Sequence, residues 1–320
     1  MHNAIDEFRQ DMMANGLTPP DHIEPGRILR TPGHQKSRSN KAAWCIMFED
    51  MRGGVYGDYS TGMEGIWHAS NSAPYTPAER DAHRQRIKAL QAQREADEAA
   101  KHADGAADAA EIWKNTTLYT GHEYTGRKGI EPHGARLIDA DKARAINARL
   151  SLELSGPLLA IPLRDAGGKL HSLQFIAGDG TKRPVTGSNV KGCYHSIGGK
   201  PTDRLVIAEG FATAASIHEA MGWPVAVAFN AGNVGPVAVA LHKKYPDLTL
   251  ILAADDDHLT PGNPGMTAAR QAALAVGGFV LAPQFPAGRP PKATDFNDLA
   301  TLAGLGAVRA CFSEIKGVVC

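Results

Sequence analysis

The last third of the chain predicts an α/β fold with a parallel sheet of about four strands flanked by helices. Two observations support this: short apolar runs of strand length alternate with helical stretches, and no tight turn joins one strand to the next. A strand, helix, strand order places the strands parallel, with helices on the sheet faces. The expected strands lie at 205–208, 224–228, 248–253 and 279–281, and the expected helices at 212–221, 234–245 and 267–276. We assign this domain to residues 201–320.

Two segments before this domain have strand-rich patterns. Residues 1–75 are rich in glycine and turn residues and contain strand-like stretches at 43–48 and 54–59, which predicts a small β-rich N-terminal module. Residues 115–200 alternate short apolar runs with glycine-containing turns, and Asp165 to Gly168 has the composition of a hairpin turn. This second segment is expected to form an α+β subdomain.

A long polar helix is expected to link these two segments, over residues 76–114. Thr76 is a good N-cap and Pro77 suits the first helical position. Alanine, arginine, glutamine and glutamate dominate the rest of this segment, which is typical of an exposed helix. Gly105 predicts a flexible break near its end.

The charge of the chain is unevenly distributed. Lysine and arginine together number 34, as do aspartate and glutamate, so the formal net charge is zero. Residues 122–200, however, hold 12 basic and 7 acidic residues. Local basic patches bind phosphate backbones, so this segment is a candidate nucleic-acid surface. An uneven, solvated surface explains the same count equally well.

Several classes of protein are disfavoured by the sequence. It has no apolar run of about 18 residues and no signal-peptide pattern, so we expect a cytoplasmic protein with no membrane contact. Its four cysteines are far apart, which argues against a zinc knuckle and a disulfide scaffold. Gly198-Gly199-Lys200 is followed by Pro201, so no phosphate-binding P-loop of a helicase ATPase is present.

Acidic residues follow the expected strands at their carboxyl ends, where α/β sheets collect their chemistry. Glu209 follows the first strand, Asp255 and Asp257 follow the third, and Asp295 follows the fourth. Alternation along extended chain would put Asp255 and Asp257 on one face and turn Asp256 away. Oxygen ligands suit Mg²⁺ or Mn²⁺ and not zinc. Each acid taken alone could instead be a helix N-cap or part of a solvated turn.

These residues resemble a Toprim domain, which bacterial-type primases, topoisomerases and some nucleases share. The surrounding segments, 208–214 and 228–233, most resemble primases of plasmids and phage-like mobile elements, including the TraC type. Segments 124–130 and 161–183 are similar to the basic N-terminal half of the primase polymerase core. One position departs from cellular replicative primases, which usually carry an acid where this chain has Thr213.

The resemblance implies roles for particular residues. Glu209, Asp255 and Asp257 would be catalytic, and together with Asp295 they would hold Mg²⁺ or Mn²⁺. The residues implied to contact nucleic acid or nucleotide are Arg127, Lys128, Arg164, Lys182, Arg183, Lys191, Asn230 and Asn233. The partners implied are a single-stranded DNA template and ribonucleoside triphosphates, and a replicative helicase would be supplied in trans.

The N-terminal module also resembles a module found with such primases, where some family members carry a zinc ribbon. Only Cys45 lies in this region, so we expect no zinc. Aromatic residues could stack on the bases of single-stranded DNA, or they could be the core of a small domain. They are Trp44, Phe48, Tyr56, Tyr59 and Trp67.

The prediction for the whole chain is a DNA primase that makes short RNA primers on single-stranded DNA. Two alternatives stay open. A Toprim-type nuclease would use the same acids to cut phosphodiesters, and a non-catalytic module would bind single-stranded DNA during replication without synthesis.

Overall fold

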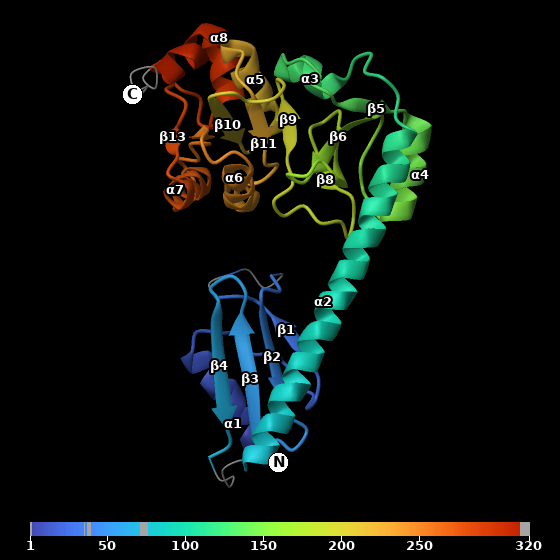
Figure 1. Cartoon of the computed structure of the whole chain (residues 1–320), viewed down its shortest axis with the longest axis vertical. Coiled ribbons are helices and arrows are strands. Elements are labelled where there is room, and N and C mark those ends of the chain that lie inside the picture. Colours follow the sequence, from blue (N-terminus) through green and yellow to red (C-terminus); the bar gives the residue numbers. More distant parts are fainter. Residues whose placement is uncertain (1, 35, 37–39, 71–75, 314–320) are drawn as a thin grey trace. The chain divides into compact units, whose positions relative to one another are not determined.

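The computed structural model describes residues 2–34, 36, 40–70 and 76–313, and the chain divides into two compact units (Figure 1). One unit covers residues 1–90 and the other residues 91–320. Residues 71–75, at the end of the expected N-terminal module, lie outside the described residues. So do residues 314–320, at the end of the expected C-terminal domain, which include Cys320.

The N-terminal unit is an antiparallel sheet with one helix packed on it. Its sheet has the order β1-β2-β3-β4. Alternation along β2 sends Cys45 toward helix α1 and Trp44 to the opposite face, and each face has its own apolar cluster. The elements are α1 (His2–Ala14), β1 (Leu29–Thr31), β2 (Ala43–Met47), β3 (Gly53–Asp58) and β4 (Met63–His68).

The loops of this unit are tied together by hydrogen bonds to a buried carboxylate. Asp58 accepts the backbone N–H of His34 at 2.6 Å and that of Ser60 at 2.7 Å, and it is only 1% exposed. Cys45 lies in the core, where burial raises its pKa to about 12. Its sulfur is therefore a buried thiol that is protonated at neutral pH.

Helix α2 (Pro77–Lys114) begins with the expected cap. The backbone N–H of Glu79 donates to the Thr76 hydroxyl, and the Glu79 carboxylate accepts the N–H of Thr76, which forms a capping box. The break expected near Gly105 is wrong, because the helix continues through it. A Cβ at this position would lie 2.7 Å from the backbone of Ser188, so glycine allows the close approach of the helix to that loop.

The α+β subdomain contains the predicted hairpin in an antiparallel sheet of order β5-β6-β7-β8. Gly168 has a φ of 91° at the turn, a conformation that favours glycine. The elements are α3 (Glu123–Lys128), β5 (Arg136–Ile138), α4 (Ala140–Leu150), β6 (Leu158–Arg164), β7 (Leu170–Ala177) and β8 (Lys182–Pro184).

The C-terminal domain has the predicted parallel sheet with one additional strand. Its order is β13-β12-β10-β11-β9, and β9 pairs antiparallel with β11. This fifth strand comes from the segment that the sequence assigned to the α+β subdomain. The elements are β9 (His195–Ile197), β10 (Arg204–Ala208), α5 (Phe211–Met221), β11 (Val225–Val227), α6 (Ala231–Lys244), β12 (Thr249–Ala253), α7 (Pro264–Val276), β13 (Phe279–Leu281) and α8 (Phe296–Ser313).

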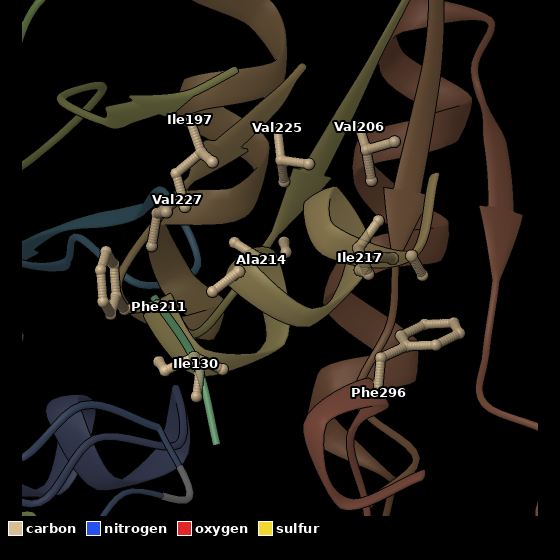
Figure 2. Packing of buried hydrophobic residues seen from close by; sticks show 14 of the residues in the cluster. Ile130, Ile197, Val206, Phe211, Ala214, Ile217, Val225, Val227 and Phe296 are labelled. Atoms are coloured by element: carbon tan, nitrogen blue, oxygen red, sulfur yellow. The ribbon is translucent and has the colours of Figure 1, made fainter. Parts of the chain in front are cut away.

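Helices cover both faces of this sheet (Figure 1). Helices α5 and α8 pack on one face with Val206 of β10, and helices α6 and α7 pack on the other with Ile207. Figure 2 shows the first cluster, in which Phe211 and Ile217 of α5 lie among strand side chains. Because the core runs through central strand β10, the strand that leads directly to Glu209 is packed from both sides.

The cysteines of this structure form no disulfide among the described residues. Cys45, Cys193 and Cys311 are buried free thiols. Within the described ranges, no helix combines the length and the apolar character that a membrane crossing requires.

Candidate active site at the carboxyl edge of the parallel sheet

The predicted acids emerge from neighbouring strands at one edge of the sheet. Glu209 directly follows β10, and Asp255 comes two residues after β12. These strands are parallel neighbours, with Ala208 paired to Ala253. Asp295 precedes helix α8, and it is brought beside the other acids because the N–H of Asp256 donates to Thr294 O at 2.8 Å.

The electrostatics of these acids indicate a shared site. Burial raises the pKa of Asp255 to about 8, with further contributions from the negative charges of Asp295, Glu209 and Asp257. Burial also raises the pKa of Glu209, and Asp257 adds to that shift. The pKa of Asp295 is raised by burial first and then by Asp298. Crowding of carboxylates therefore disfavours full ionisation of the site without a cation.

The individual carboxylates differ in their partners. Asp257 Oδ2 accepts the N–H of Gly265 at 3.1 Å, at the start of α7. Asp295 Oδ1 accepts the N–H of Asp298 at 2.8 Å, so it is an N-cap of α8 as well as a neighbour of the other acids. Asp255 Oδ1 is buried and has no hydrogen-bond partner.

The acids fit a hard divalent cation in charge and donor type. An unpartnered, buried carboxylate oxygen among other carboxylates is costly unless a cation compensates it. The donors are oxygens only, which suits Mg²⁺ or Mn²⁺. Among the residues that the structure describes, no three His, Cys, Asp or Glu side chains are arranged ready to hold a metal ion. The fit is thus one of charge and ligand chemistry, and the final ligand positions would form on binding.

Two of the predicted basic residues lie beside the acids. Lys182 of β8 is influenced by Asp295, Asp255, Glu209 and Lys128. Its side chain stays accessible to solvent, but the surrounding protein removes part of its hydration. That loss lowers the pKa of Lys182 more than the acids raise it.

Lys128, at the end of α3, ion-pairs with Asp298 at 3.5 Å. Its backbone is fixed because Asn297 Nδ2 donates to Lys128 O at 2.8 Å and to Ser216 Oγ at 3.0 Å. The α+β subdomain therefore contributes positive charge to the acidic edge of the sheet.

Tyr124 belongs to the site although no role was predicted for it. Its ring lies 5.7 Å from Lys182 Nζ, and its hydroxyl is buried without a hydrogen-bond partner. Burial raises the pKa of Tyr124 to about 12, and the charge of Asp295 adds to the shift. The tyrosine was visible in the segment that resembles primases, but its burial next to Asp295 has no signal in sequence.

Of the remaining predicted basic residues, Arg127 acts on the pKa of Tyr124 through its charge, and none is shown to contact the acids. Arg127 Nη1 donates to Gly178 O at 2.7 Å, and Arg164 Nη1 donates to Gly168 O at 3.0 Å. Arg183 neighbours Lys182 on β8, so alternation points it away from the acids. Lys191 is exposed in the loop before β9. Their predicted contacts with nucleic acid stay predictions.

The two predicted asparagines lie at the start of α6. Asn230 is exposed at the helix N-cap. Asn233 is buried, accepts the N–H of Gly192 at 2.7 Å, and donates to Cys193 O and Ala228 O. This amide joins the loop before β9 to the residue after β11, so Asn233 has a structural role.

Of the five aromatic residues considered for base stacking, four are buried in the N-terminal unit. Tyr59 is 57% exposed and carries Arg30 over its ring at 4.9 Å. For the other four the core interpretation is confirmed. They are Trp44, Phe48, Tyr56 and Trp67.

Known proteins resemble this chain at the level of a domain family and of whole sequences. The Toprim domain family matches residues 204–305, and these residues therefore form a Toprim domain. Over 296 residues, 88% of its length, the chain is 34% identical to a DNA primase TraC of Escherichia coli. A second DNA primase TraC of Escherichia coli is 43% identical over 154 residues, 45% of the chain. Most of the chain is thus similar to TraC primases, and residues 204–305 match the Toprim domain family.

The chain spans only 27% of the first of these relatives and 11% of the second. Two solved structures are also similar. The primase of Aquifex aeolicus, with its zinc-binding and RNA polymerase domains, matches 98% of this chain and 86% of its own, at 14% identity and a TM-score of 0.45. The primase fragment of the bacteriophage T7 primase-helicase protein matches 89% and 98%, at 12% identity and a TM-score of 0.43.

Proposed function

We propose that this chain is a DNA primase that synthesises short RNA primers from ribonucleoside triphosphates on a single-stranded DNA template. The observation that carries the proposal is the meeting of two opposite charge patterns. Carboxylates from three separate segments of the Toprim domain gather at one sheet edge, and Lys182 and Lys128 of the preceding subdomain face them. Acids that hold cations, beside bases that hold phosphates, suit nucleotidyl transfer.

Each group has a proposed role. Glu209, Asp255, Asp257 and Asp295 would hold Mg²⁺ or Mn²⁺, and Glu209 is also a candidate general base. A divalent cation bound there would neutralise charge on the triphosphate and favour ionisation of the attacking hydroxyl. Lys182 would bind a phosphate of the incoming nucleotide.

The template would follow the other basic side chains. Arg127, Arg164, Arg183 and Lys191 lie on the subdomain of residues 115–200, and they would bind the DNA backbone electrostatically. In the N-terminal module, Tyr59 is our candidate for stacking on a base.

The organisation of the protein follows from this function. The proposed catalytic domain is residues 201–320 together with strand β9, which belongs to its sheet. The rest of residues 115–200 would be the template subdomain, 76–114 the linker and 1–75 the DNA-binding module. A replicative helicase would act in trans, in the cytoplasm where plasmid DNA is copied, and the catalytic site needs no zinc.

The test is primer synthesis on defined single-stranded templates with labelled ribonucleotides and Mg²⁺ or Mn²⁺. The parent protein should make labelled oligoribonucleotides. Asp255→Asn and Asp257→Asn should reduce synthesis by at least ~100-fold, since each removes a charge that the transition state needs. Asp247→Asn, an exposed acid of the same domain, is the matched control and should retain activity. Full synthesis by either active-site variant would refute the assignment.

The same assay separates the alternatives. Shortened template without labelled product would indicate a Toprim nuclease. Template binding that needs no metal, without synthesis or cleavage, would indicate a non-catalytic DNA-binding module.

A further inference from the structure

Arg289 makes an unusually complete set of contacts at the edge of the acidic site. It lies between β13 and α8, in the segment that leads to Asp295. Its Nη1 donates to Asp256 Oδ2 at 2.6 Å, and its Nη2 donates to Asp256 O at 2.9 Å. Its Nε donates to Ala293 O at 2.8 Å, and its guanidinium lies 4.2 Å from the ring centroid of Phe285. One side chain thus joins the end of β12 to the segment before α8.

The second carboxylate oxygen of Asp256 is bound by Asn263. Asn263 Nδ2 donates to Asp256 Oδ1 at 2.8 Å, so both carboxylate oxygens have a partner. Asn263 Oδ1 also accepts the N–H of Asp257 at 2.9 Å. Asn263 adopts a φ of 40°, an uncommon conformation for a residue other than glycine. We call Arg289, Asp256 and Asn263 the Asp256 clamp.

The clamp fixes the backbone on which the site acids stand. Asp255 and Asp257 flank Asp256 directly, and the Asp256 N–H donates to Thr294 O, next to Asp295. Since successive residues of extended chain point to opposite sides, anchoring Asp256 outward turns its two neighbours toward the site. Three of the four acids are therefore attached to elements that meet at the clamp.

The Asp256 clamp also neutralises the negative charge of Asp256. Asp256 lies between two acids of a crowded site, and its own negative charge is paired with Arg289. A fifth unpaired carboxylate there would add to the repulsion. Arginine suits this place because its planar fork reaches three acceptors at once, which a lysine ammonium on a flexible chain cannot do with the same geometry.

We propose that Arg289 is a positioning residue that, through Asp256, sets the geometry in which Asp255, Asp257 and Asp295 bind a divalent cation. It does not touch the cation or the substrate. Partners that orient metal ligands commonly change metal affinity by 10- to 100-fold when removed. The inference deepens the proposed function, but its test can be read without primer synthesis.

Arg204 provides a closely matched control. It ion-pairs with Asp203 at 2.7 Å, lies 4.6 Å from the ring centroid of Trp223, and has a side chain 19% exposed. The corresponding values for Arg289 are 2.6 Å, 4.2 Å and 20%. Arg204, however, begins β10 and so lies at the opposite end of the strand from Glu209.

The experiment measures Mn²⁺ binding to the full chain by electron paramagnetic resonance of the free ion, together with thermal unfolding. Arg289→Ala should weaken Mn²⁺ binding by about 10-fold or more, whereas Arg204→Ala should leave it within about twofold of the parent. Arg289→Lys separates charge from geometry: it should remain weakened, because one ammonium cannot replace the fork.

A double-mutant cycle with Asp256→Ala tests the route through Asp256. The double variant should bind Mn²⁺ no more weakly than the weaker of the two single variants, because each single change already breaks the ion pair between Arg289 and Asp256. Parent-level Mn²⁺ binding by folded Arg289→Ala, full recovery in Arg289→Lys, additive effects in the cycle, or a parent that binds no Mn²⁺ would each overturn the proposal. If the parent binds Mn²⁺ as expected but makes no primers, the primase assignment fails and the clamp stands.

Discussion

Replacing Asp255 by asparagine should make the metal-free protein more stable. The carboxyl of Asp255 is buried among other acids, and its pKa is raised from its usual value near 3.8 to about 8. A raised carboxyl pKa means that stability is fully present at low pH and is lost as the pH rises toward 8. Asparagine has nearly the same shape and no charge to lose hydration, so it should remove this dependence.

The magnitude follows from the size of the shift. At about 1.4 kcal/mol per pKa unit, a shift of this size corresponds to several kcal/mol, an upper limit because buried charges are relieved by relaxation and water entry. We therefore expect a gain of about 1–3 kcal/mol near pH 8, which is a rise of roughly 2–10 °C in Tm for a unit of this size. The gain should shrink as the pH approaches 5.

The assay is calorimetric unfolding in a chelator between pH 5 and pH 8.5, repeated with Mn²⁺. Added Mn²⁺ should stabilise the parent and have much less effect on Asp255→Asn, since a ligand stabilises only the form that binds it. Asp247→Asn should follow the parent in both conditions. If Asp255→Asn melts at or below the parent throughout this pH range, the acids are not crowded as described and the reasoning fails.

Two further changes test other parts of the molecule. Lys182→Gln should raise the KM for ribonucleotides by ~10-fold while leaving Tm unchanged. The control Lys169→Gln, at an exposed lysine, should change neither quantity. Equal KM values for Lys182→Gln and the parent would exclude Lys182 from nucleotide binding. Gly105→Ala should destabilise the 91–320 unit by about 1–3 kcal/mol in urea unfolding, because its Cβ would press on the backbone of Ser188. The control Gly126→Ala, in α3 with open space around it, should leave stability unchanged in that assay. An unchanged stability for Gly105→Ala would contradict the prediction and show that the loop at Ser188 can move to make room for the Cβ.

The parallel sheet and the gathering of acids could be predicted from the sequence because both follow from local patterns. Apolar runs such as 205–208 and 248–253 are buried strands, and the chain leaves them at the edge where parallel strands end. Asp255 and Asp257 then share a face by simple alternation. No long-range information is needed for these steps.

Long-range pairing explains most of the features that could not be predicted. Strand β9 is three residues long and pairs with β11, 28 or more residues later in the chain, so no pattern near His195 marks it as part of that sheet. Arg289 looks like an ordinary loop arginine until Asp256 is folded against it. The break expected at Gly105 failed for the same reason, because the contact that explains that glycine lies at Ser188.

The pairing of β9 with β11 also decides where this protein can be divided. A fragment starting at residue 204, where the Toprim match begins, would lack β9 and leave β11 with an unpaired edge. The Asn233 amide, whose partners include Gly192 and Cys193, would lose two of its three hydrogen bonds. Bare strand edges template aggregation, so such a fragment should express poorly. Anyone isolating the catalytic half should begin the clone well upstream, so that residues 190–200 travel with it.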